Sequence, residues 1–250
     1  MNLRVATWNL ARPVASERDR NAALAHCLGE VGADIWILTE SHVALSPGPA
    51  FTPIETIASD RVQDPGEVWT VIWSRFPMTR LPTGADPARS VAALVEPPDG
   101  GALVVYGTVL PWLGSPWGGY ASKGGKAYVA AVRAQQAEWR TLQADHAKCT
   151  FILAGDFNQD LGEVHHYGSR AQRAALEQAL YEAGLVCLTS GADDPVRAQT
   201  GGHWQSIDHI CVSAGVASHA ARPRRAWPAG TEPQRRLTDH FGVAVELPGA

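Results

Sequence analysis

The sequence contains little cysteine, and its four cysteines are widely separated without any C-x-x-C pair. Structural zinc sites are built from closely spaced ligand pairs, so this spacing argues against one. Three of the cysteines lie in apolar segments, where we expect buried, reduced thiols. We see no cysteine paired with a plausible catalytic base, which argues against thiol-dependent catalysis.

Long apolar runs and an excess of positive charge are also missing. No run approaches the roughly 20 apolar residues that a membrane span requires. The N-terminus starts almost at once with a strand-like segment at 3–8 and shows no basic region followed by an apolar core. We therefore expect no signal peptide and a cytoplasmic protein. The formal net charge of -4 predicts no general attraction to nucleic acid or anionic membranes.

Core-forming residues, by contrast, are plentiful. Hydrophobic residues make up 45% of the chain, including nine tryptophans. The sequence shows no internal repeat and no interdomain linker, so we expect residues 1–250 to form one domain. Segments rich in proline and glycine at 46–53, 113–126 and 221–233 are expected to be long loops of that domain.

The pattern of apolar residues predicts many strands and three helices. Helical periodicity covers 17–31, 127–147 and 170–183. Strand-like runs occupy 3–8, 35–39, 68–73, 91–95, 103–110, 151–154, 185–188, 207–212 and 242–247. Helices alternate with strands only part of the time, which favours mixed sheets covered by helices over a simple doubly wound sheet.

The segment FILAGDFN at 151–158 is the most informative part of the chain. Four apolar residues predict a buried strand, Gly155 allows the backbone to turn, and Asp156 and Asn158 can then project in one direction. A carboxylate and an amide at a strand mouth are costly without partners, and useful if a metal and a phosphate lie there. An ordinary turn would also favour Asp and Asn, so this segment alone leaves both interpretations open.

Polar residues of this kind stand at the boundaries of five predicted strands. These residues are Asn9, Glu40, Asp156 with Asn158, Asp208, and Asp239 with His240. Any single one of them could be a turn residue or a solvent-facing strand end. Together they favour convergence on one site, because their oxygen atoms suit Mg²⁺ or Mn²⁺ and an aspartate could orient the imidazole. A metal, a positioned water and donors to phosphoryl oxygens are the parts that phosphoryl transfer needs.

Six short motifs occur in the order typical of one family. They are VATWN at 5–9, DIWILTE at 34–40, SRFP at 74–77, GDFN at 155–158, SIDHI at 206–210 and LTDHF at 237–241. In these motifs the chain resembles the endonuclease/exonuclease/phosphatase superfamily. Its members are Mg²⁺-dependent phosphoesterases and include abasic-site endonucleases and pancreatic-type deoxyribonucleases.

The resemblance implies an α+β fold, a four-layer sandwich of two mixed β-sheets packed face to face with helices outside. It implies a metal site for Mg²⁺, or Mn²⁺, with Glu40 as principal ligand assisted by Asn9 and Asp239. It also implies catalytic roles. Asp156 would position or activate water, Asn158 would contact the phosphate, and Asp208 would pair with His240. The implied substrate is a phosphate ester, which could be a nucleic acid, a nucleotide or a small phosphoester. No obligate protein partner is expected.

One position departs from the family pattern. Many relatives carry a histidine where this chain has Val109, and valine can neither donate a proton nor bind phosphate. His165, His166 and Tyr167 could replace it, or could be ordinary surface loop residues. His203 and Trp204 could likewise line the pocket or merely cover it. The departure leaves an alternative function open, a non-catalytic phosphate- or nucleic-acid-binding module on the same fold.

Overall fold

The computed structural model describes residues 2–57, 65–98, 100–120, 125–162, 164–217, 224–229 and 237–248. These residues form two mixed six-stranded sheets. The first sheet has the order β11 (Arg224–Trp227), β12 (Gly242–Leu247), β1 (Leu3–Asn9), β2 (Ile35–His42), β4 (Glu67–Ser74) and β3 (Thr52–Glu55). The second has the order β5 (Met78–Leu81), β6 (Ser90–Val95), β7 (Leu103–Val109), β8 (Thr150–Asp156), β10 (Asp208–Ser213) and β9 (Leu185–Cys187).

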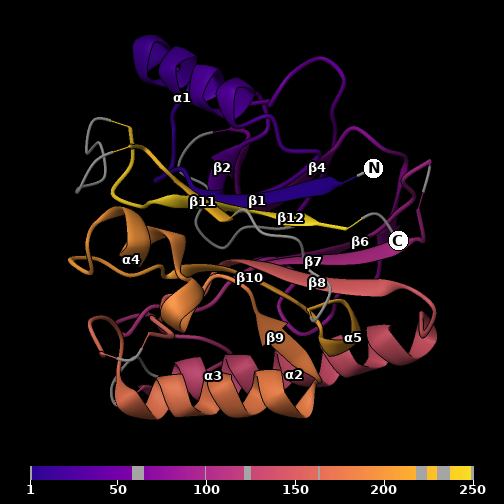
Figure 1. The fold of residues 1–250 in the computed structure, drawn as a ribbon, viewed down its shortest axis with the longest axis vertical. Helices are drawn as coiled ribbons and strands as arrows, with labels where there is room; N and C mark the ends of the chain where they lie inside the picture. The colour runs from indigo at the N-terminus through magenta and orange to yellow at the C-terminus, as the bar shows by residue number, and fades with distance from the viewer. Residues whose placement is uncertain are drawn as a thin grey trace.

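The two sheets pack face to face, and helices cover their outer faces (Figure 1). Helix α1 (Arg18–Val31) lies on the first sheet, while α2 (Lys126–Asp145) and α3 (Arg170–Glu182) lie on the second. Three separate groups of buried apolar side chains fill the spaces between these four layers. The predicted four-layer sandwich is confirmed.

The three long helices occur close to their predicted positions. Gly32 ends α1 in the left-handed conformation, with φ of 61°, a conformation that glycine adopts without steric cost. Ser169 caps α3 through its side chain, which accepts a hydrogen bond from the backbone nitrogen of Gln172 at 3.2 Å. Shorter helical turns are η2 (Gly191–Asp193), α4 (Pro195–Gln199) and α5 (Ala214–Ala217). None of the helices within the described ranges combines the length and apolar character needed to cross a membrane.

Three strands were not predicted, and all three lie at sheet edges. Strand β3 overlaps the predicted loop 46–53, β11 lies within the predicted loop 221–233, and β5 was not predicted at all. Their side chains are largely half-buried or exposed, so they lack the apolar run that marks a central strand. Pro53 is tolerated in β3 because an edge strand does not need every backbone donor. The parts of the predicted loops at 121–124, 221–223 and 230–233 lie outside the described residues.

Strand alternation carries polar residues to one end of the inter-sheet core. Along β8, Ile152 and Ala154 point into this core, and Asp156 is the next residue on the same face. Along β10, Ile210 lies in the same core and Asp208 precedes it by two residues. The core is therefore apolar along most of its length and polar where β8 ends and β10 begins.

Candidate active site

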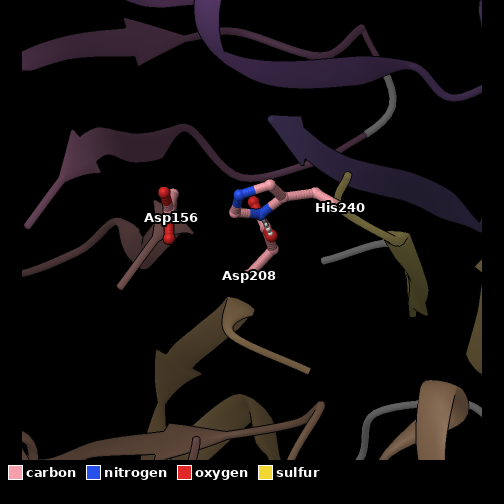
Figure 2. Close-up of side chains that lie close together, drawn as sticks. All are labelled: Asp156, Asp208 and His240. Carbon is pink, nitrogen blue, oxygen red and sulfur yellow. Dashed lines mark hydrogen bonds and ion pairs between the residues drawn. The ribbon is translucent and has the colours of Figure 1, made fainter. Parts of the chain in front are cut away.

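Asp156 and Asp208 lie directly opposite each other on antiparallel strands. The two residues are register partners on β8 and β10, and both side chains are buried. His240 belongs to the segment that precedes β12, and its Nδ1 lies 2.6 Å from Asp208 Oδ2. Figure 2 shows the imidazole between the two carboxylates. The sequence prediction that Asp208 and His240 would meet corresponds to a short contact in the structure.

The electrostatics of this group follow from burial and from the closeness of like charges. Two carboxylates opposite each other on one sheet face repel, and burial adds a desolvation cost. Burial raises the pKa of Asp156 to about 7; Asp208 and Glu40 act in the same direction, while the charge of His240 opposes them. Burial by itself lowers the pKa of His240, but the charges of Asp208 and Asp156 outweigh it and raise that pKa to about 10. The imidazole is therefore held as a cation between two acids.

Asn9 connects Glu40 to this group. Its side-chain nitrogen donates to Asp156 Oδ2 at 3.0 Å and to Glu40 Oε1 at 3.3 Å. Its side-chain oxygen accepts from the backbone nitrogen of Ala11 at 2.9 Å. Asn9 and Glu40, which the sequence predicted as metal ligands, thus lie beside Asp156. For the Asn9 oxygen to face a cation between the two acids, the amide would have to turn over and release Ala11.

Glu40 lies inside β2 and not just beyond its end, and its backbone is strained. Its φ is 44°, and Ala11 and Arg12 on the facing loop have φ of 50° and 53°. Side chains with a Cβ rarely adopt this region, and such strain gathers at functional sites. Arg12 Nε donates to Glu40 Oε2 at 2.9 Å and holds the carboxylate in place.

Asn158 also has a left-handed backbone, with φ of 49°, and lies against Asp156. Its backbone nitrogen donates to Asp156 Oδ1 at 2.8 Å. Its side-chain nitrogen donates to Leu110 O at 2.9 Å and to Asp156 Oδ2 at 3.0 Å. Both amide protons of Asn158 therefore have protein acceptors, and a phosphate would have to replace one of them.

Asp239 is the least enclosed of the predicted site residues. Its side chain is 76% exposed, and its Oδ1 lies 4.0 Å from His240 Nε2. The charges of Asp156, Asp239 and Glu40 all raise the pKa of the Tyr167 phenol, so Asp239 lies near the same phenol as the other two acids. Its carboxylate nevertheless faces solvent and makes no closer ion pair among the described residues.

A pocket of about 680 Å³ opens beside Asp208, Asp239 and His240. Its walls come from loops distant in the sequence and include His166, Tyr167 and Trp204. These are three of the residues for which the sequence left a surface role open. Trp204 is 42% exposed, so the pocket offers an accessible aromatic surface next to the half-buried imidazole of His240.

The donor chemistry of the site fits a divalent cation. Asp208 Oδ1 is buried and has no hydrogen-bond partner among the described residues. Carboxylate oxygens of Asp156 and Asp208 lie within 4.8 Å of each other. A hard cation such as Mg²⁺ or Mn²⁺ compensates buried carboxylates that lack donors. This group adjoins the predicted ligands Asn9 and Glu40 through Asp156.

Val109 lies beside Asp156 on the neighbouring strand. It is the last residue of β7 and the register partner of Asp156 on β8. Its side chain is fully buried, and its backbone nitrogen donates to Arg89 O at 3.1 Å. An apolar side chain therefore occupies a position one strand away from the central carboxylate.

The sequence reasoning missed Asp160, a buried acid two residues after Asn158. Its Oδ2 accepts from the backbone nitrogens of His166, at 2.6 Å, and of Tyr167. Its Oδ1 lies 3.5 Å from Arg173 Nη1. The only signal in the sequence was an acid two residues after the GDFN motif, and acids are also common in exposed loops.

One cysteine lies beside a histidine, contrary to what the sequence predicted. Cys187 Sγ lies 3.6 Å from His209 Nδ1, so one cysteine does stand beside a base once the chain is folded. The imidazole is fully buried, and its Nε2 lies 3.0 Å from Gln159 O. His209 is not among the residues that line the pocket, so this pair offers no reactive thiol to a ligand there.

Comparisons with known proteins identify the family and the fold. Residues 6–240 match the model of the Endonuclease/Exonuclease/phosphatase family. Among solved structures, an AP endonuclease from Leishmania major is 15% identical, with a TM-score of 0.70 over 100% of this chain and 88% of that chain. A 3′-5′ exonuclease from Neisseria meningitidis is 20% identical, with a TM-score of 0.60 over 98% and 99%. Sphingomyelinase C from Streptomyces griseocarneus is 16% identical, with a TM-score of 0.62 over 99% and 100%.

These structural likenesses, all at low identity, show the fold. Among curated proteins, none matches the sequence significantly. The family match spans nearly the whole chain, from the strand that carries Asn9 to His240. This chain belongs to the Endonuclease/Exonuclease/phosphatase family, a family of phosphoester hydrolases.

Proposed function

We propose that this protein is a divalent-metal-dependent hydrolase of phosphoester bonds that works by in-line attack of water. The observation that carries the proposal is the facing pair Asp156 and Asp208 with His240 between them, at the polar end of the inter-sheet core. Four acids whose charges act on one another around one imidazole would be costly if they served folding alone. They suit a reaction in which negative charge develops on a phosphate.

The residues assigned to hold the cation are Glu40, as principal ligand, with Asn9 and Asp239. Glu40 is supported by its contact with Asn9 at 3.3 Å and by Arg12, which fixes its other oxygen. When bound, Mg²⁺ or Mn²⁺ would polarise a phosphoryl oxygen and neutralise charge as it develops. Asp239 supplies an exposed carboxylate on the pocket side.

The remaining residues handle water and phosphate charge. Asp156, with a pKa raised to about 7 by burial, is suited to orient a water or take its proton near neutral pH. His240 donates a hydrogen bond from Nδ1 to Asp208, so its Nε2 can donate to the phosphate. Asn158 would exchange one of its present acceptors for a phosphoryl oxygen. Together these donors stabilise the charge on the equatorial oxygens.

A second candidate is a phosphate- or nucleic-acid-binding module without turnover. Val109 favours it, because the missing histidine would typically contribute roughly 10²–10⁴ in rate as a general acid. The intact group of Asp156, Asp208 and His240 argues against it, since a module needs no carboxylate pair facing its anionic ligand.

Hydrolysis of bis(4-nitrophenyl) phosphate by the full chain separates the two candidates. We expect turnover with Mg²⁺ or Mn²⁺ that a chelator abolishes and the added metal restores. Asp156→Asn should remove it, whereas Asp19→Asn, the same change at an exposed position of α1, should not. Tight phosphate binding without turnover would favour the module, and chelator-insensitive turnover would contradict the metal dependence.

The natural ester is then found with a panel of substrates. Nucleic acids, nucleotides and small phosphoesters are all represented, so that nuclease, phosphodiesterase and phosphatase activity are compared under one metal condition. The solved relatives include an AP endonuclease, an exonuclease and a sphingomyelinase, so the fold supports more than one ester class. The substrate with the highest kcat/KM in this panel identifies the class.

A further inference from the structure

Tyr167 brings a hydroxyl to the pocket beside the site, whereas the buried Val109 offers no donor. Its side chain lines the pocket that also exposes Asp208 and His240. Its hydroxyl lies 3.5 Å from Asn158 Oδ1, and Asn158 in turn contacts Asp156. The phenol therefore stands at the edge of the carboxylate group, on a loop that follows the GDFN motif and not on β7.

The loop that carries Tyr167 is held by buried polar groups. Asp160, fully buried, accepts from the backbone nitrogens of both His166 and Tyr167. Gln159 Nε2 donates to Tyr167 O at 2.7 Å. Gly168 has φ of 83°, and a Cβ there would come within 2.1 Å of Gln159 Oε1. A surface loop without a function does not need buried side chains to bind its backbone, because the backbone groups of loops are normally hydrogen-bonded to water.

The hydroxyl of Tyr167 is available to a ligand. An O···O separation of 3.5 Å is longer than a normal O–H···O bond, so the phenol proton is only weakly held by Asn158. Burial raises the pKa of Tyr167, and the charges of Asp156, Asp239 and Glu40 raise it further, so the group remains a donor at neutral pH. By contrast, both amide protons of Asn158 already have protein acceptors.

We propose that Tyr167 is a catalytic residue whose hydroxyl donates a hydrogen bond to a phosphate oxygen of the bound ester, in place of the donor that Val109 cannot supply. Asp160 is the positioning residue that fixes the loop. This inference rests on the proposed function of the site, since it assigns one further residue to the same reaction. No proton leaves the phenol in this role; it donates a hydrogen bond and keeps its proton.

Tyr167→Phe tests the proposal because it removes the hydroxyl and little else. Tyr181→Phe, at an 81% exposed position on α3, is the matched control. We expect kcat/KM for an aryl phosphodiester to fall roughly 10- to 100-fold in Tyr167→Phe, between the effect of one neutral hydrogen bond and that of an oxyanion donor. The inhibition constant of inorganic phosphate should rise in parallel. The thermal midpoint of both variants should match that of the unaltered protein.

Two results would overturn the role of Tyr167. One is a kcat/KM in Tyr167→Phe that stays within about 2-fold of the unaltered protein, which is below the effect of one net hydrogen bond. The other is a loss of activity that comes with a lower thermal midpoint and an unchanged phosphate constant, which would indicate a structural role only.

The test also separates this inference from the proposed function. If the unaltered protein hydrolyses no ester of the panel, the proposed function fails, and binding of inorganic phosphate to the full chain is measured by calorimetry instead. Weaker phosphate binding by Tyr167→Phe than by Tyr181→Phe would still support the contact. Equal binding by the two variants would overturn it.

Discussion

The contact between Asp208 and His240 joins residues 32 positions apart in the sequence and sets the charge of the imidazole. We expect His240→Ala to lower kcat by roughly 10²–10⁴, the usual contribution of such a group. Asp208→Asn should have a milder effect, because an amide oxygen can still accept from Nδ1 but carries no charge. Steady-state kinetics of the two variants show whether kcat falls further in His240→Ala than in Asp208→Asn. Full activity in Asp208→Asn would contradict the pairing.

Glu40 is the residue at which metal binding can be tested apart from the fold. Glu40→Gln keeps the shape of the side chain and the strained φ of 44°, so the free energy of unfolding should change little. The substitution removes the ion pair between Arg12 and Glu40, which is partly exposed and contributes about 0–1 kcal/mol to stability. The affinity for Mg²⁺ or Mn²⁺, measured by calorimetry, should fall together with activity. Glu55→Gln on the edge strand β3 is the control and should bind the metal normally.

At the level of elements, Gly155 allows β7 and β8 to pair closely beside Asp156. Its φ is 139°, and a Cβ at this position would lie 1.9 Å from Thr108 O. Gly155→Ala should therefore lower the free energy of unfolding by about 3 kcal/mol or more, since strain and a backbone clash add. Gly29→Ala in α1, where nothing lies within 4 Å, should raise it by about 0.5–1 kcal/mol. Denaturant unfolding measures both, and equal effects would contradict the clash.

The elements differed in how well the sequence predicted them. Central strands such as β1 and β12 carry apolar runs, and their predicted positions agree with the structure to within one residue at each end. The edge strands β3, β5 and β11 were missed, because a strand that pairs on one side only needs no apolar run to form. The three long helices were found because burial of one face imposes a 3.6-residue period.

At the scale of the whole molecule, both sheets contribute to the core between them. This core takes side chains from β1 and β12 as well as from β8 and β10, and β1 pairs with β12 from the other end of the chain. We propose, as the sequence suggested, that residues 1–250 form one domain. Calorimetry should then show one unfolding transition with equal calorimetric and van't Hoff enthalpies. Two resolved transitions would contradict it. The cytoplasmic location stays a prediction.

The sequence by itself determined on which face of a strand each side chain lies, because alternation along a strand is a local property. It was sufficient to name Asn9, Glu40, Asp156, Asp208 and His240 as one group. Only the tertiary structure decided the contacts across sheets and loops. His240 contacts Asp208, and the Asn9 amide donates to both Asp156 and Glu40. Asp160 accepts hydrogen bonds from the backbone of the loop that carries Tyr167. Such contacts depend on how the two sheets stack and on the path of a loop back to them. The periodicity of a single segment does not encode the distance between side chains of different segments.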